Sequence, residues 1–177
     1  MPVFARTKLQ IWDDCLFPGV PFMNFRYTGP NPQNIYKKIK DLLIVVWKVD
    51  LSEVQEKEFG WDRESATEKF NVKLEVTKDL DSFSYEWIEV ELNGTARHSR
   101  QFGKEGDATI RITGALRTEY PQETLWQRSL FYEMFRAFYH KVVYEDARKK
   151  YLQGCRDHLN TFQEEIKSFL NLLQKSS

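Results

Sequence analysis

The chain has 177 residues, of which 41% are hydrophobic, 15% aromatic and 29% charged, a composition typical of one globular domain with a sizeable core. Its 26 Lys and Arg residues equal its 26 Asp and Glu residues, so the net charge gives no positive field that would hold a polyanion. Composition therefore argues against strong nucleic-acid binding. The longest apolar run, residues 42–47, is far shorter than a transmembrane helix.

The cysteines and histidines do not form a recognisable metal or redox motif. Cys15 and Cys155 are distant in sequence, and His98, His140 and His158 lack the spacing of zinc ligands. The first residues also lack the apolar core of a signal peptide. We therefore expect reduced thiols, no metal, no cofactor and a cytoplasmic location.

The first third of the chain predicts a strand, a second strand and a helix. Residues 3–11 alternate as a strand would, although residues 1–21 also contain a prolyl turn. Residues 22–27 form a second predicted strand. Asn31-Pro32 then provides a candidate N-cap followed by proline, and residues 35–46 have apolar side chains at helical spacing over about four turns.

Residues 51–120 have the two-residue period of an antiparallel meander of about five strands. Strands are predicted over 54–61, 70–77, 83–92, 95–102 and 108–117. Asn93-Gly94 matches a glycosylation sequon with Thr95, but it is also a strong signal for a two-residue hairpin, which we favour. The alternation changes parity between Trp87 and Ile88, which predicts either a β-bulge or a strand that is apolar on both faces.

The last fifty residues, from Glu123 to about Lys175, contain no proline and one glycine, and they predict one very long helix. Its first apolar seam consists of Phe131, Phe135, Phe138 and Val142. A second seam follows in the same heptad phase: Leu152, Cys155, Leu159, Phe162, Ile166, Phe169 and Leu173. We expect the sheet to hold the segment 124–144, which leaves the second seam for another partner or for a helix that breaks near Gly154 and folds back.

This order of elements resembles the helix-grip superfamily, which includes START lipid-transfer domains, birch-pollen-type allergens and polyketide cyclases. The matching segments are residues 22–27, the helix after Asn31-Pro32, the strands of 54–117 and the helix that begins near Thr124. The resemblance implies an α+β fold in which a curved antiparallel sheet wraps around a long C-terminal helix, with a cavity between them. We therefore expect a helix-grip domain over 1–146 and a C-terminal helical extension over 147–177.

The expected function is the binding of a hydrophobic or aromatic small molecule, or a lipid, between the sheet and the first half of the terminal helix. A solid core filled by the same side chains is an equally acceptable interpretation. The candidate ligand-binding residues are Phe70, Val72, Leu74, Tyr85, Trp87, Ile110 and Ile112 from the sheet and Phe131, Met134, Phe135 and Phe138 from the helix.

A basic cluster in the meander is a second candidate site. It could bind a carboxylate or phosphate group, or it could lie on a solvated sheet face and form cross-strand ion pairs with Glu86, Glu89 and Glu91, which we favour. The cluster consists of Arg97, His98, Arg100, Arg111 and Arg117.

Two other functions remain as alternatives. The chain could be a protein-interaction module that forms a homodimer, or binds a partner helix, through Leu152 to Leu173. It could also be a cyclase-like or aromatase-like enzyme that uses the same cavity, although no catalytic motif is present and no catalytic residue is assigned.

Overall fold

The computed structural model describes residues 10–16, 20–63, 67–100, 103–120 and 124–175. In chain order its strands and helices are β1 (Gln10–Asp14), β2 (Met23–Pro30), α1 (Asn34–Trp47), β3 (Val54–Asp62), β4 (Thr67–Asp79), β5 (Ser84–Ser99), β6 (Gly103–Glu119), α2 (Leu130–Val142) and α3 (Glu145–Lys175). Two short 3₁₀ helices, η1 (Leu51–Glu53) and η2 (Trp126–Arg128), complete the set. Of the predicted N-terminal strand, residues 3–9 lie outside the described residues.

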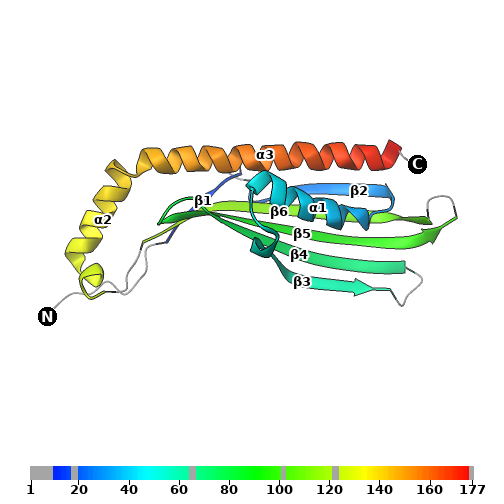
Figure 1. Ribbon diagram of the computed structural model, residues 1–177, viewed down its shortest axis with the longest axis horizontal. Coiled ribbons are helices and arrows are strands. Elements are labelled where there is room, and N and C mark those ends of the chain that lie inside the picture. Colours follow the sequence, from blue (N-terminus) through cyan, green and yellow to red (C-terminus); the bar gives the residue numbers. More distant parts are fainter. Residues whose placement is uncertain (1–9, 17–19, 64–66, 101–102, 121–123, 176–177) are drawn as a thin grey trace.

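The six strands form one antiparallel, curled sheet that does not close into a barrel. Its order is β1-β6-β5-β4-β3, and β2 also pairs with β6. The long strand β6 therefore has two partners along one edge: β2 pairs with its first half and β1 with its second half. Helices α1 and α3 lie on the same side of the sheet, with α3 extended along it (Figure 1). The α+β fold predicted from the sequence, a curved sheet with a long C-terminal helix, is confirmed.

The core follows the two-residue alternation of the strands. On β4 the side chains of Phe70, Val72, Leu74 and Val76 are buried, while the residues between them are polar. The α1 residues predicted at helical spacing, Ile35 to Val46, are buried against this surface together with Trp47. Helix α1 ends at Lys48, which adopts the left-handed conformation (φ 54°) that is more often taken by glycine.

The two halves of the terminal stretch have the opposite roles to those expected. The second seam packs onto the sheet, because Cys155, Leu159, Phe162 and Ile166 are all at most 1% exposed. The first seam lies on α2, which bends away from the sheet at one end of the molecule (Figure 1). The predicted grip by residues 124–144 is therefore wrong. The seam from Leu152 to Leu173, for which a partner and packing onto the chain's own domain were both open, packs on the chain's own core, with Leu152, Phe169 and Leu173 partly buried at its margin. The predicted long helix is interrupted between Val142, where α2 ends, and Glu145, where α3 begins. Helix α3 then continues without a break through Gly154.

The predicted hairpin at Asn93-Gly94 is wrong, because both residues lie within strand β5. The strand continues without a register shift from Ser84 to Ser99, paired with β4 and β6 on its two sides. Gly94 is needed for packing, since a Cβ atom there would collide with the Phe70 ring and the carbonyl oxygen of Asp107. The change of parity at Trp87 comes from a strand with apolar side chains on both faces, which was one of the two predicted explanations.

Cys15 and Cys155 form a disulfide bond, with a Cα–Cα distance of 5.7 Å. The expectation of reduced thiols is therefore wrong. Sequence spacing gave no signal for this bond because the cysteines are 140 residues apart and meet only when α3 lies along the sheet edge. The bond fixes the chain just after β1 to the middle of α3.

Candidate functional site

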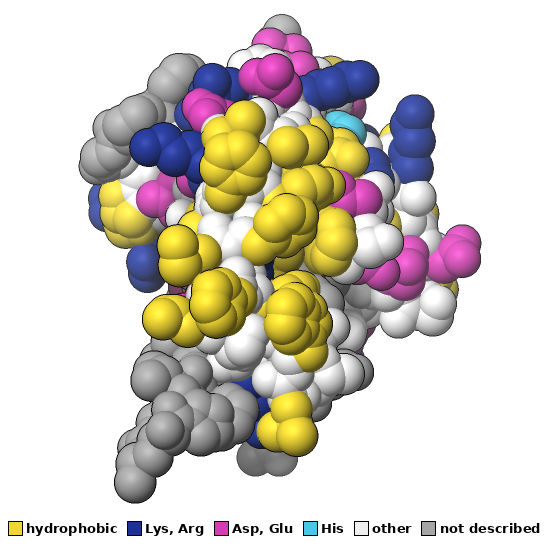
Figure 2. Space-filling model, turned by 90° about the vertical axis from the view of Figure 1, so that its left-hand side faces the viewer, with side chains coloured by type: hydrophobic (Ala, Val, Ile, Leu, Met, Phe, Trp, Pro, Cys, Tyr) yellow, Lys and Arg dark blue, Asp and Glu magenta, His cyan; other side chains and the backbone are white. Residues whose placement is uncertain are grey.

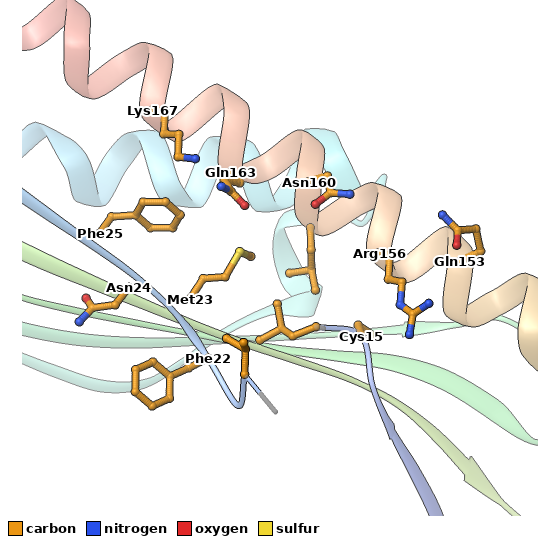
Figure 3. Close-up of a pocket in the computed structure, with 13 residues that line it drawn as sticks. Cys15, Phe22, Met23, Asn24, Phe25, Gln153, Arg156, Asn160, Gln163 and Lys167 are labelled. Atoms are coloured by element: carbon orange, nitrogen blue, oxygen red, sulfur yellow. The ribbon is translucent and has the colours of Figure 1, made fainter. Parts of the chain in front are cut away.

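A groove lies between the edge strand β2 and helix α3, with a volume of about 660 Å³. Figure 3 shows its lining residues, which come from the segment between β1 and β2, from the start of β2 and from α3. Its apolar side chains are Leu16, Val20, Phe22, Met23, Phe25 and Leu159, next to the disulfide at Cys15. Its polar side chains are Asn24, Gln153, Arg156, Asn160, Gln163 and Lys167.

The alternation of β2 supplies the apolar wall. Met23 and Phe25 pair in register with Ile112 and Ile110, whose side chains are fully buried on the inner face of the sheet. Met23 and Phe25 therefore extend toward α3, as Figure 3 shows. Because β2 is an edge strand, these two side chains are only partly covered.

Helix α3 supplies the polar wall through a stripe beside its buried seam. The stripe residues recur in steps of three and four, which places them on one face of the helix. They are Gln153, Arg156, Asn160, Gln163 and Lys167. The groove therefore has an apolar wall from the strand and a wall of amides and cations from the helix.

Two cations face the groove, and none of the described lining residues is acidic. The Nε atom of Arg156 is buried and has no hydrogen-bond partner among the described residues. The Nζ atom of Lys167 lies 5.8 Å from the centroid of the Phe25 ring. A buried guanidinium donor without an acceptor is costly, and an oxygen from a ligand or an ordered water would satisfy it.

The predicted ligand-binding residues are divided among three places. Five of them lie in the solid core beneath α1 and α3: Phe70, Val72, Leu74, Ile110 and Ile112. Tyr85 and Trp87 lie on the outer face of the sheet, where the Tyr85 hydroxyl donates a hydrogen bond to Glu119 (2.9 Å) and Trp87 packs against Arg117. The other four, Phe131, Met134, Phe135 and Phe138, are exposed on α2. None of the eleven lines the groove.

Sequence reasoning missed the groove because it assigned the wrong half of the terminal stretch to the sheet. One signal was available: the polar stripe beside the second seam has two cations and no carboxylate, which distinguishes it from an ordinary solvated helix face. The strand that faces it was predicted over residues 22–27, and β2 extends three residues further, to Pro30. Its position at the sheet edge depends on pairing with residues 105–112 of β6, which lie 75 to 89 residues later in the chain.

The three glutamates of β5 that were expected to pair with the basic cluster do not lie in the groove. Glu86 is 1% exposed on the inner face, where its Oε2 atom is 3.0 Å from Nδ1 of His158, a residue of α3 whose ring packs on Trp47. Glu89 and Glu91 lie on the outer face and form ion pairs with Lys73. The buried Glu86–His158 pair thus links β5 to α3, and no described lining residue of the groove is an acid or a histidine.

The basic cluster does not converge: Arg97, Arg111 and Arg117 lie on the outer face of the sheet, while His98 and Arg100 lie at the exposed end of β5. Arg111 lies 3.9 Å from Glu91 and packs over the Phe22 ring, and Arg117 lies between the rings of Trp12 and Trp87. Arg97, His98 and Arg100 are at the far end of β5, where Arg97 is opposite Glu105 of β6. These positions support a solvated face with cross-strand ion pairs and give no convergent anion site.

A buried polar network fixes the junction between α2 and α3. The Tyr144 hydroxyl donates to Asp81 (2.6 Å) and is 2.7 Å from the Ser84 hydroxyl, which in turn is 2.7 Å from Thr118. Burial and the neighbouring Asp81 raise the pKa of Tyr144, so it stays protonated and keeps its donor. This network holds the start of α3 on the β4–β5 turn.

Aromatic and histidine side chains connect α2 to the sheet. The Tyr120 hydroxyl is 2.8 Å from Nδ1 of His140, and burial raises the pKa of Tyr120 to about 12. Burial, together with the nearby Arg148, lowers the pKa of His140 below its ordinary value of 6.5, although Asp13 and Glu145 act in the opposite direction.

The part of the chain that the structure describes contains no group of three or more His, Cys, Asp and Glu residues that could hold a metal ion. Nor do the described helices include one that is both long and apolar enough to cross a membrane.

Comparison with known proteins leaves the family open. No protein-family model matches the chain, and no curated protein does. Among solved structures it is similar to a Staphylococcus aureus protein of unknown function, with 9% sequence identity and a TM-score of 0.30 over 93% of this chain and 96% of the other.

Proposed function

We propose that this protein binds an amphiphile, a small molecule or lipid with an apolar body and an anionic group, in the groove between β2 and α3. The observation that carries the proposal is the position of Arg156 and Lys167 beside an apolar wall, in a groove whose described lining has no carboxylate to pair with them. The proposal keeps the ligand class that the sequence suggested and moves its site from α2 to α3.

The dimensions and lining of the groove support this ligand class. A volume of about 660 Å³ is within the range of small-molecule sites, roughly 300–1,000 Å³. An apolar chain or ring system would contact Met23, Phe25 and Leu159. A carboxylate or phosphate would accept from Arg156, whose planar guanidinium can form two parallel hydrogen bonds with such a group.

The arrangement of sheet and helix also supports the proposal that the chain belongs to the helix-grip superfamily, whose lipid-transfer members bind ligands between these elements. The cytoplasmic location stays a prediction. The disulfide favours an oxidising compartment, since such bonds are rare in the cytosol outside hyperthermophiles.

Titration calorimetry with two matched probes tests the function. We expect the full chain to bind palmitate and to bind the uncharged hexadecanol more weakly. Arg156→Gln should weaken palmitate binding about 10- to 100-fold, because a charge-assisted hydrogen bond contributes roughly 1.5–3 kcal/mol. The same substitution should leave the affinity for hexadecanol within about threefold.

Two further variants serve as controls. Arg26→Gln removes an exposed arginine of β2 that lies outside the groove lining. This variant should bind both probes with unchanged affinity. Met23→Trp places a larger side chain in the groove and should weaken the binding of both probes. The proposal fails if neither probe binds, or if Arg156→Gln and Arg26→Gln bind palmitate equally well.

A further inference from the structure

Helix α2 presents its apolar side chains to solvent. Phe131 is 77% exposed, Phe135 67%, Met134 65% and Phe138 60%. The surface continues through exposed apolar residues before and after these four: Leu125, Trp126, Leu130, Val142 and Val143. Figure 2 shows hydrophobic side chains gathered on this end of the molecule. We call these nine residues the α2 apolar face.

The polar side of α2 faces the protein, which reverses the usual orientation of a surface helix. Arg136 is 4% exposed and packs over Tyr120, and His140 contacts the same tyrosine. The attachment to the domain thus uses the polar and tyrosine-rich side, and the phenylalanines remain outside. A contiguous apolar surface of this kind marks an interaction site.

The angular width of the α2 apolar face favours contact with a broad apolar medium over contact with a single partner helix. At about 100° per residue, the exposed apolar residues of α2 cover an arc of roughly 140°. A paired helix would cover the narrow stripe of Phe131, Phe135, Phe138 and Val142, which recur in steps of four and three. Leu130 and Met134 would stay exposed beside it, as would Leu125 and Trp126 before the helix. Helix α2 also lies at one end of the molecule, away from the sheet and α1 (Figure 1).

The charges around the face favour an anionic surface. Two cationic side chains, Arg128 and Lys141, are exposed in residues 124–143, and Arg136 is buried on the side of α2 that faces the protein. Glu133 is engaged by Arg136, and Glu145 just beyond the helix is engaged by Lys149 (2.7 Å). Asp146 is an exposed carboxylate at the start of α3, while the exposed Lys141 lies among the apolar residues of α2 itself. Trp126, which is 67% exposed beside the face, is of a residue type that gathers at membrane–water interfaces.

From the exposure, width and charge of this surface, we propose that the α2 apolar face docks on an anionic phospholipid membrane. The helix lies in the plane of the interface with Phe131, Phe135 and Phe138 inserted among the acyl chains. This site is separate from the groove between β2 and α3, so it holds whether or not the groove binds an amphiphile.

Vesicle co-sedimentation with the full chain tests the docking. We expect binding to vesicles of phosphatidylcholine with 30% phosphatidylglycerol, and weaker binding to phosphatidylcholine alone. The double variant Phe131→Asn/Phe135→Asn should reduce the partition coefficient at least tenfold on both. Lys141→Glu should reduce it several-fold on the anionic vesicles only, and should show a smaller effect at high salt.

A matched control is available in exposed apolar residues elsewhere. Val45 on α1 is 69% exposed and Leu172 on α3 is 62% exposed, so Val45→Asn/Leu172→Asn removes comparable apolar surface away from α2. This double variant should bind vesicles as the unmodified chain does. Circular dichroism and thermal unfolding should show that all variants fold.

Three results would overturn the docking. The first is no binding of the unmodified chain to either vesicle. The second is equal losses for the α2 double variant and for its control. The third is a concentration-dependent dimer that Phe131→Asn/Phe135→Asn abolishes while vesicles have no effect, which would make a second copy of the chain the occupant.

Discussion

At the scale of single residues, Gly114 and Gly154 show that the contribution of a glycine to stability depends on its surroundings. Gly114 of β6 lies under α3, and a Cβ atom there would be 2.9 Å from the terminal methyl groups of Ile88 and Leu159. The missing side chain is what lets the helix approach the sheet. Gly154, in the middle of α3, would place a Cβ atom more than 4 Å from any neighbour.

Substitutions at these glycines should change stability in opposite directions. Gly114→Val should lower the free energy of unfolding by about 1–3 kcal/mol through overpacking. Gly154→Ala should raise it by up to about 1 kcal/mol, because alanine favours the helix and meets open space. Urea unfolding of both variants measures the two changes. A Gly114→Val variant as stable as the unmodified chain would contradict the close packing of α3.

At the scale of elements, the attachment of α2 depends on a histidine that is favoured in its neutral form. The pKa of His140 is lowered by burial and then by Arg148, so the folded state binds its proton less readily than the unfolded state does. The resulting stabilisation is fully present above the ordinary pKa of 6.5. It is lost as the pH falls from 6.5 through the lower folded value.

We therefore expect the free energy of unfolding to decrease as the pH is lowered from 7 to 5. The His140→Gln variant should show a smaller decrease over the same pH range. Protonation of Nδ1 also prevents it from accepting from the Tyr120 hydroxyl, which loosens α2. Chemical unfolding at a series of pH values measures the slope. His98→Gln, a change at an exposed histidine of β5, should leave that slope as it is.

At the scale of the whole molecule, the disulfide connects the segment after β1 to α3 beside the groove. It closes a loop with a sequence separation of 140 residues, and restricting the unfolded chain over that distance contributes about 5 kcal/mol in the chain-entropy model. Both cysteines are buried, so reduction requires at least local opening between β1 and α3.

Removal of the bond should be among the most destabilising changes in this chain. We expect the Cys15→Ala/Cys155→Ala double variant to lose about 2–5 kcal/mol of unfolding free energy. Comparing its urea midpoint with that of the oxidised chain checks this. If the two midpoints coincide, or if mass spectrometry finds two free thiols in the native protein, the disulfide does not contribute.

The sequence by itself determined the elements whose patterns are local. The two-residue alternation from Phe70 to Val76 and the helical spacing from Ile35 to Val46 predicted β4 and α1, and the order of elements predicted a curved sheet with a long C-terminal helix. Each of these patterns records which side of one segment is apolar, and that depends only on near neighbours in the chain.

Only the tertiary structure decided which apolar surface the sheet covers. The seams at Phe131 to Val142 and at Leu152 to Leu173 have the same spacing, so periodicity cannot choose between them. The choice came from contacts distant in sequence: Gly114 admits Leu159, Cys15 bonds to Cys155, and Glu86 pairs with His158. Those contacts hold α3 on the sheet and place Arg156 beside β2, and they leave the phenylalanines of α2 on the outside.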